Sequence, residues 1–501
     1  MAELFLSGVA EIFQIRVLII IFLGVIAGIL AGLIPGFTVT MAIVLTLPLT
    51  FGLDPVAGVA AMIGVLVGGM SGGLITAALL GIPGTPSSVA TTFDAFPMAQ
   101  KGQPGKALSI GIWASFLSSI VSLVLLISIA PQIANIALMF GPWEMFSLIV
   151  AALTIIASVT GDSILKGLIA GLFGMLIATV GADPIIGVSR YSFDIDALRA
   201  GIPFLVVLIG MFAISRILVS VEKSEMEKDF EKKQQEKIDG IQFVLKPKET
   251  FMAVVRKPAN LIRSSAIGAI IGAIPGAGGS IANIIAYDQA KKWSKTPKKF
   301  GTGHEEGVVA SEAGNNSTVG GDLIPTIALG IPGSAVTAVL LSALMVHGIS
   351  PGPLLISNEP NIVGGMFLAF LVASFFMLIT QFLGIKYFVK VTEIPTHILV
   401  PVILVLCVIG TFVLNNRVTD LYLLFFIGLA GYFFAKYKFA LAPIIIGVIL
   451  GPIAEVNLRR AFMSDPEWTL FFTRPISMVF LVLAVLSVVI TIWQTKRMNS
   501  K

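Results

Sequence analysis

The chain has 501 residues, of which 56% are hydrophobic and only 12% are charged, against roughly a quarter charged in soluble domains. Its 33 basic and 28 acidic residues give a formal net charge of +5, and in so apolar a chain a small basic excess is typical of cytoplasmic loops. The composition therefore excludes a soluble protein, gives no support to nucleic-acid binding, and predicts an all-α polytopic membrane protein surrounded by the lipid bilayer.

Apolar runs follow one another along the chain, and a helix of about 20 apolar residues spans a bilayer. The runs 17–53, 55–93, 107–143 and 323–358 contain no charged residue, and each is long enough for a span and a re-entrant piece. Shorter apolar runs lie near 145–161, 163–181, 201–215, 264–287, 361–385, 396–414, 420–435, 439–454 and 475–494. Together they predict about 10–12 transmembrane helices.

The stretch 221–257 interrupts this pattern, because it carries 8 acidic and 9 basic residues. It predicts a cytoplasmic linker between a first transmembrane half, 1–220, and a second half, 258–501. The C-terminus is expected on the cytoplasmic side as well. Cys407 is the only cysteine, so neither a disulfide framework nor a cysteine metal site is expected.

The two halves contain a related unit. Residues 51–85 align without a gap on residues 300–334, and the sequence LGIPG occurs at the same place in both. Upstream, GLIPG (32–36) aligns with GAIPG (272–276). A shared series of apolar helices broken at Gly and Pro predicts a duplicated structural unit.

The cations around the two copies differ. In the second copy, three cations between 256 and 263 precede the first segment and five lysines between 291 and 299 follow it, whereas the first copy has Arg16 alone. Since cytoplasmic loops gather Lys and Arg, the copies are expected to face opposite sides of the membrane. The prediction is two inverted repeats with Gly/Pro-broken helices and re-entrant hairpins, whose core motifs lie in 32–108 and 272–353.

Paired breaks in inverted repeats point to the binding site of a secondary transporter. Backbone groups freed by a break must face protein or water rather than lipid, and a helix that restarts after Pro-Gly presents N–H groups suited to an anion. GTPSS (84–88) and GSAVT (333–337) are such restarts, and the upstream breaks at 35–40 and 275–280 would close the site. The predicted solute-binding residues are Thr38, Thr40, Gly84, Thr85, Ser87, Ser88, Gly276, Gly278, Gly279, Ser280, Gly333, Ser334 and Thr337.

One polar segment, SEAGNNSTVGGD (311–322), has no counterpart in the first copy. Its Asn and hydroxyl oxygens, with carbonyls freed near its glycines, suit a hard monovalent cation. The alternative is a structural role for the Asn side chains, worth about 1 kcal/mol between helices. The predicted Na⁺ ligands are Asn315, Asn316, Ser317 and Thr318. Proton coupling through Glu312 or Asp322 is the competing hypothesis, because intramembrane carboxylates are functional candidates.

Enzyme motifs are weak in this chain. GMSG (69–72) is similar to the G-x-S-G of intramembrane serine proteases and would use Ser71 as nucleophile, with His347 as a conceivable base. Zinc, Walker-type and paired-cysteine motifs do not occur in the sequence. The chain is therefore expected not to be an enzyme and to need no cofactor, with Na⁺ as coupling ion. An intramembrane serine hydrolase and a passive channel are the alternatives.

Four stretches carry a resemblance to a known family. They are GLIPG (32–36), GIPGTPSSVATTFDAFPMAQKGQPGKAL (81–108), GAIPGAGGSIAN (272–283) and EGVVASEAGNNSTVGGDLIPTIALGIPGSAVTAVLLSALMVHGISPGP (306–353). With them the chain resembles, over nearly its whole length, the large membrane subunit (TctA type) of the tripartite tricarboxylate transporter family.

The resemblance implies a permease of the bacterial inner membrane that takes up carboxylates such as citrate, driven by an ion gradient. It also implies two partners, a small membrane subunit and a periplasmic solute-binding protein. Where the family carries a Gly-rich pattern and an aromatic residue before Gly-Gly, this chain has PGFTVTMA (35–42) and Ser71-Gly72-Gly73. The resemblance therefore leaves open which carboxylate is transported.

Overall fold

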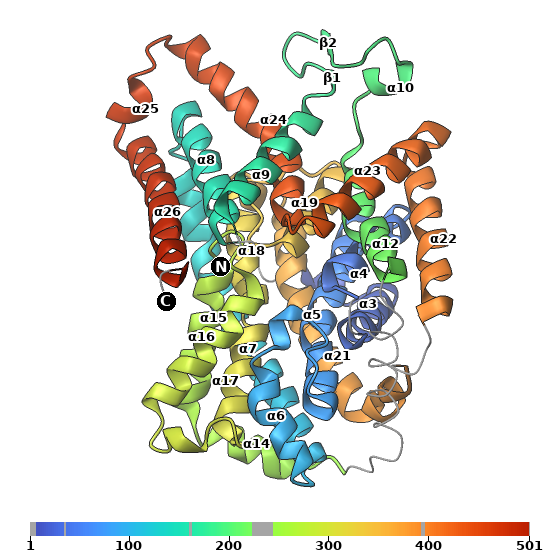
Figure 1. Ribbon diagram of the computed structural model, residues 1–501, viewed down its shortest axis with the longest axis vertical. Helices are drawn as coiled ribbons and strands as arrows, with labels where there is room; N and C mark the ends of the chain where they lie inside the picture. Colours follow the sequence, from blue (N-terminus) through green and yellow to red (C-terminus); the bar gives the residue numbers. More distant parts are fainter. Residues whose placement is uncertain (1–6, 35–36, 160–162, 223–243, 392–395, 500–501) are drawn as a thin grey trace.

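A computed structural model describes residues 7–34, 37–159, 163–222, 244–391 and 396–499 of the chain (Figure 1). In the first half the elements are α2 (Val9–Ile12), α3 (Ile15–Leu33), α4 (Val39–Thr46), η1 (Leu47–Thr50), α5 (Pro55–Leu80), η2 (Pro86–Ser88), α6 (Thr91–Gln100), α7 (Pro104–Ala137), α8 (Pro142–Val159), α9 (Ile164–Ala178), β1 (Gly181–Ala182), β2 (Ser189–Arg190), α10 (Asp196–Arg199), α11 (Phe204–Leu208), the π-helix η3 (Ile209–Ile214) and α12 (Ser215–Glu222).

In the second half they are α14 (Pro247–Val255), α15 (Pro258–Gly272), α16 (Gly278–Trp293), η4 (Pro297–Lys299), α17 (Glu305–Asn316), α18 (Thr318–Leu329), α19 (Ala335–Val346), α20 (Leu355–Asn358), α21 (Pro360–Val391), α22 (Thr396–Asn415), α23 (Val418–Lys436), α24 (Leu441–Ser464), α25 (Leu470–Thr473) and α26 (Pro475–Asn499). The strands β1 and β2 form one antiparallel pair, with Gly181 opposite Arg190.

The predicted fold class is confirmed. Within the described ranges, 9 helices are long and apolar enough to cross a membrane, and four shorter apolar helices accompany them. The shorter ones include α4 and α19, which follow two of the predicted breaks and are too short to cross alone. The prediction of about 10–12 spans thus counts broken segments together with complete crossings.

Helix α5 forms the centre of the bundle, and 94% of its most apolar window is buried. It is apolar on all sides, as a helix enclosed by other helices must be, and glycines let α3 approach its backbone closely. A Cβ placed on Gly28 would lie 2.2 Å from the carbonyl oxygen of Val65, and one placed on Gly72 would lie 2.4 Å from that of Ile29. The sequence thus encodes this contact through small residues rather than through polar bonds.

The second half repeats this packing with α15 against α17 and α18. A Cβ on Gly268 would lie 2.3 Å from the carbonyl oxygen of Gly314, and one on Gly321 would lie 2.2 Å from that of Ala269. These four residues are the aligned counterparts of Gly28, Val65, Gly72 and Ile29. Equivalent positions therefore make equivalent contacts, which supports the predicted repeat; the inverted orientation of the copies stays a prediction.

One difference separates the two units. Where the first has the single 26-residue helix α5, the second has α17 and α18, which meet at Ser317. Residues 223–243, which make up much of the predicted linker, lie outside the described residues, as do Pro35 and Gly36 of the first break. The hairpin β1–β2 and α10 lie at one end of the bundle, and α14 lies at the other (Figure 1).

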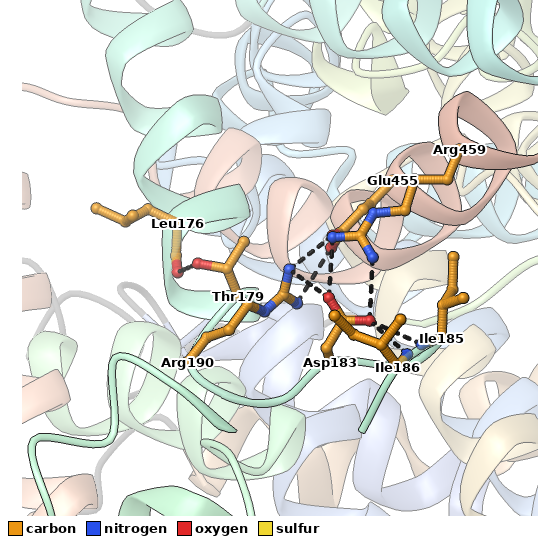
Figure 2. Close-up of polar contacts among 8 residues, drawn as sticks. All are labelled: Leu176, Thr179, Asp183, Ile185, Ile186, Arg190, Glu455 and Arg459. Carbon is orange, nitrogen blue, oxygen red and sulfur yellow. Dashed lines mark hydrogen bonds and ion pairs between the residues drawn. The ribbon is translucent and has the colours of Figure 1, made fainter. Parts of the chain in front are cut away.

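A cluster of four charged side chains holds the hairpin to the last turns of α24 (Figure 2). Arg190 contacts Glu455 at 2.6 Å and Asp183 at 3.3 Å, and Arg459 contacts Asp183 at 2.9 Å and Glu455 at 2.8 Å. The pKa of Asp183 falls from its ordinary 3.8 to about 2, first because the backbone N–H of Ile186 donates to the carboxylate and then through Ile185 and Arg459. The cluster fixes the far end of a helix whose first residues line the cavity described next.

Candidate functional site

A cavity of about 600 Å³ is lined by residues of α4, η2, α12, α16, α18, α19, α23 and α24. All four predicted breaks contribute to its wall. Nine of the predicted solute-binding residues line it, namely Thr38, Thr40, Thr85, Ser87, Gly276, Gly278, Gly279, Ser280 and Ser334. The tertiary structure therefore brings together segments that are separated by up to about 300 residues in the chain.

The remaining predicted residues shape the turns that carry the cavity wall. Thr85 and Ser88 form a capping box at η2, and Ser334 and Thr337 form the equivalent one at α19. Each preceding helix ends at a left-handed glycine, with φ of 70° at Gly81 and 69° at Gly330. Such glycine ends and hydroxyl caps fix where a helix stops and restarts, so Ser88 and Thr337 act as supports of the cavity wall.

Gly84 and Gly333 let each turn lie directly on the upstream break. A Cβ on Gly84 would lie 2.3 Å from the carbonyl oxygen of Gly32, and one on Gly333 would lie 2.8 Å from that of Gly272. Both positions require glycine for this close approach. The two turns are thus built alike, with matched residues in matched contacts.

Arg216 lines the cavity and was missed by the motif-based prediction, because it lies in neither repeat motif. It is the second residue of α12, directly after the π-helical segment η3, and such segments often mark functional sites. No described carboxylate forms an ion pair with it. The sequence did contain a signal for this residue, because Arg216 directly follows the apolar run 201–215. Charged residues within membrane spans are candidates for a functional role.

Asp322 also lines the cavity, from α18. Its side chain is buried, and its Oδ1 has no hydrogen-bond partner among the described residues. The aligned position in the first unit is Gly73, which faces the Thr85 hydroxyl. The cavity wall therefore carries one cation and one carboxylate among otherwise neutral described side chains.

The four predicted Na⁺ ligands point in different directions. The hydroxyls of Ser317 and Thr318 donate to carbonyls one turn earlier, at 2.6 Å each. Asn316 donates to Ser115 and Glu312. Asn315 donates to Met70, and its Oδ1 is buried without a described partner. Of the four, Asn315 is the one with a side-chain oxygen that is buried and has no hydrogen-bond partner in the described structure, and the Na⁺ site stays a prediction.

Glu312 lies behind the cavity wall and is fully buried. Its carboxylate accepts hydrogen bonds from Thr91 at 2.5 Å, Ser115 at 3.0 Å and Asn316 at 3.2 Å. A buried carboxylate with three donors is well satisfied. Because Thr91 begins α6, just after the first restart, Glu312 links the polar segment of the second unit to the motif of the first.

Asp94 is another buried carboxylate, and the sequence analysis did not single it out. It accepts hydrogen bonds from the backbone N–H groups of Gly301, Gly303 and His304, over 2.7–3.0 Å, and from the Tyr287 hydroxyl at 2.8 Å. Four donors to one carboxylate hold the loop before α17 against α6. Asp94 therefore stabilises the contact between the two units and does not line the cavity.

The serine-hydrolase alternative required Ser71 and His347 to meet. Ser71 is buried and accepts a hydrogen bond from Gln381 at 2.9 Å, whereas the His347 ring lies against Gly58. Gly58 and Ser71 are 13 residues apart on the straight run of α5, which corresponds to about 20 Å along the helix. The structure therefore does not form this nucleophile–base pair.

Comparisons with known proteins agree with this architecture. The family described as "Tripartite tricarboxylate transporter TctA family" matches residues 18–446. An "Uncharacterized 52.8 kDa protein in TAR-I ttuC' 3'region" of Agrobacterium vitis is 33% identical over 421 residues, covering 83% of this chain and 81% of its own length. An "Uncharacterized protein in TAR-II ttuC' 3'region" of the same organism is 33% identical over 226 residues, covering 45% of this chain and 93% of its own length. No solved structure matches. The chain belongs to the TctA family of tripartite tricarboxylate transporters.

Proposed function

We propose that this chain is the large permease subunit of a tripartite system that takes up carboxylates, and that the cavity is where the carboxylate binds. The observation that carries the proposal is Arg216, a cation without a described ion-pair partner in a cavity within the membrane-spanning bundle. The Arg216 side chain is exposed at the cavity wall, and its planar donor set fits a carboxylate.

The broken segments supply the other contacts of the carboxylate. The first turns of α4, α16 and α19 begin at the cavity, and unpaired N–H groups at helix starts attract anions. Hydroxyls of Thr85, Ser87 and Ser334 add neutral donors along the wall. Binding therefore combines one charge-assisted pair at Arg216 with dipolar contacts from both structural units, which would move relative to one another during alternating access.

The distribution of charge between the two ends of the bundle supports an orientation of the chain in the membrane and a place for its partners. The connection between α16 and α17 carries Lys291, Lys292 and the lysines of η4. The charged helix α14 lies at the same end of the bundle (Figure 1). By the positive-inside rule this end faces the cytoplasm of a bacterial inner membrane. The hairpin end would then receive solute from a periplasmic binding protein, while the small membrane subunit completes the tripartite assembly that the family name implies.

We propose Na⁺ as the coupling ion, with Asn315 Oδ1 as one ligand, because this buried acceptor has no described partner and lies 3.0 Å from the position of a Cβ on cavity-lining Gly279. Proton coupling is the second candidate. It is favoured by Glu312 and Asp322, two buried carboxylates without an ion-pair partner among the described residues.

The test is uptake of radiolabelled citrate, malate and succinate into liposomes that contain the permease and its small subunit, with the binding protein added outside. Arg216→Gln should raise the KM for uptake about 10- to 100-fold, the value of a charge-assisted hydrogen-bond pair. Arg460→Gln, which removes an exposed arginine at the end of α24, is the matched control and should leave the KM unchanged.

Three outcomes separate the alternatives. Accumulation under a Na⁺ gradient alone supports Na⁺ coupling, and accumulation under a pH gradient alone supports proton coupling. Equilibration without any gradient and without the binding protein would identify a passive channel instead. An unchanged KM in Arg216→Gln would remove the cavity from the solute pathway.

A further inference from the structure

Asp322 lies directly against the second helix restart. It is 4% exposed, and its Oδ1 accepts no hydrogen bond from a described residue although it belongs to the cavity wall. The Cα of Asp322 is 2.8 Å from the position of a Cβ on Gly333, and the next residue, Ser334, lines the same cavity. A buried carboxylate at a cavity wall that lacks hydrogen-bond donors needs another partner, such as a cation or a proton, to satisfy it.

Arg216 is the only other charged side chain among the described residues that line this cavity. Helix α18 itself contains no other charged residue. Glu312 precedes Asp322 by ten residues on the neighbouring helix α17, or about 15 Å along a helix. Helix α15 contacts α18 at Gly272, and Arg263 is nine residues earlier, or about 14 Å away along that helix.

The other helices that pack on α18 bring no charge close to Asp322. Helix α7 contacts it at Ser122, sixteen residues or about 24 Å from Lys106. On α16 the titratable groups begin at Tyr287, seven residues or about 10 Å beyond cavity-lining Ser280. Helices α5, α19 and α20 contain no charged residue. Within the described structure Asp322 therefore forms no ion pair, and Arg216 is the one cation that shares its cavity.

We propose that Asp322 is the site at which a monovalent cation, Na⁺ or a proton, neutralises the cavity and thereby lets the carboxylate bind. The inference rests on the carboxylate-binding role proposed above. A charged carboxylate in a low-dielectric cavity is costly without a counter-ion, and it repels an incoming anion across the same space. Neutralising Asp322 removes both penalties and leaves Arg216 as the uncompensated charge that attracts the solute.

This arrangement couples the two ligands thermodynamically. If the cation raises the affinity of the cavity for the carboxylate, the carboxylate raises the affinity for the cation by the same factor. Both ligands would meet at the second restart, because Asp322 lies against Gly333 and the neighbouring Ser334 belongs to the proposed solute site. The cavity then favours the doubly loaded state, which is what cotransport of cation and anion requires.

The first unit explains why the described part of the cavity wall carries only one such carboxylate. At the position of Asp322 it has Gly73, whose added Cβ would lie 2.7 Å from the Thr85 hydroxyl. The first restart is therefore neutral, whereas the second carries the switchable charge. Glu312 is the other buried carboxylate of the segment, but it lies outside the cavity wall and both of its oxygens already accept hydrogen bonds.

The experiment measures binding of radiolabelled citrate, malate and succinate to the permease purified with its small subunit. Na⁺ is titrated at constant pH, and pH is titrated without Na⁺. In the wild type one of these cations should tighten carboxylate binding about 5- to 150-fold, the usual range of coupling between two ligands. Asp322→Asn should bind the carboxylate equally well with and without that cation. Glu144→Gln, the control, alters a buried carboxylate outside the cavity and should keep the cation dependence.

A second variant and a second measurement guard against misfolding. Asp322→Gly installs the residue that the first unit tolerates at the same position, and it should lose cation dependence in the same way. In liposomes both variants should exchange labelled for unlabelled carboxylate but fail to accumulate it. Cation dependence retained in both variants would overturn the role of Asp322. A wild-type protein that binds none of the three acids under any condition would instead overturn the proposed carboxylate function.

Discussion

Asn315 in α17 donates a hydrogen bond from Nδ2 to the backbone carbonyl oxygen of Met70 in α5 over 2.9 Å. The other end of the same amide, Oδ1, faces Gly279 at the start of α16. One side chain thus bridges the central helix of the first unit and a broken segment of the second, beside the cavity. No motif comparison would have paired these residues, which are 245 positions apart.

Asn315→Leu should abolish the Na⁺ dependence of uptake. It installs an apolar side chain where the first unit has Leu66, removes the free acceptor and breaks the bond to Met70. Loss of one interhelical hydrogen bond costs about 1 kcal/mol, so the variant should fold. Ser374→Ala is the control, because that buried hydroxyl donates to the Phe370 carbonyl one turn earlier in α21. Uptake with a full Na⁺ dependence in Asn315→Leu would place the ion elsewhere.

Thr85→Val combined with Ser334→Val should raise the KM for carboxylate uptake strongly. Both residues line the cavity and their hydroxyls cap the turns of its wall, and loss of each cap should also cost about 1 kcal/mol of stability. Exchanging the two residues, as Thr85→Ser with Ser334→Thr, keeps both hydroxyls and should preserve the KM. The measurement is initial uptake rate against solute concentration, and an unchanged KM in the double Val variant would remove both groups from the site.

Gly28→Ala and Gly268→Ala should each destabilise the bundle by about 1–3 kcal/mol, the usual cost of overpacking. An added Cβ would lie 2.2 Å from the Val65 carbonyl oxygen in one case and 2.3 Å from that of Gly314 in the other. Gly52→Ala is the control, because nothing lies within 4 Å of its added Cβ. Thermal unfolding of detergent-purified protein measures the effect. Stability loss in only one of the pair would contradict the equivalence of the two packing sites.

The cluster at the hairpin should make the protein sensitive to acid. The folded pKa of Asp183, about 2, is below its ordinary 3.8, so the ionised form is favoured by folding. Its stabilising contribution is fully present above about pH 4 and is lost as pH falls towards about 2. Asp183→Asn should lower the thermal stability at neutral pH. The stability of this variant should also decrease less than that of the wild type between about pH 4 and about pH 2. Asp194→Asn, whose side chain is fully exposed, should behave as the wild type in the same unfolding measurement.

The class of protein could be predicted from the sequence because it follows from local properties. Long uncharged runs require a lipid environment for the helices, and the Gly/Pro breaks at 81–84 and 330–333 require protected backbone wherever they lie. The gap-free alignment of the two units also anticipated their matched contacts, since identical spacing of glycines produces identical helix approaches. These inferences need no knowledge of which segments meet.

What the sequence by itself determined was thus a duplicated set of broken membrane helices, with hydroxyls and glycines at each restart. Only the tertiary structure decided that all four breaks surround one cavity, and that Arg216 and Asp322 lie in its wall while Glu312 lies behind it. It also showed that the side chains of residues 315–318 do not converge on one point, because most of their donors bond to helix carbonyls or to Glu312. The reason is physical: spacing along the chain fixes which face of a helix a residue occupies, but the partner of that face is set by the packing of helices hundreds of residues apart.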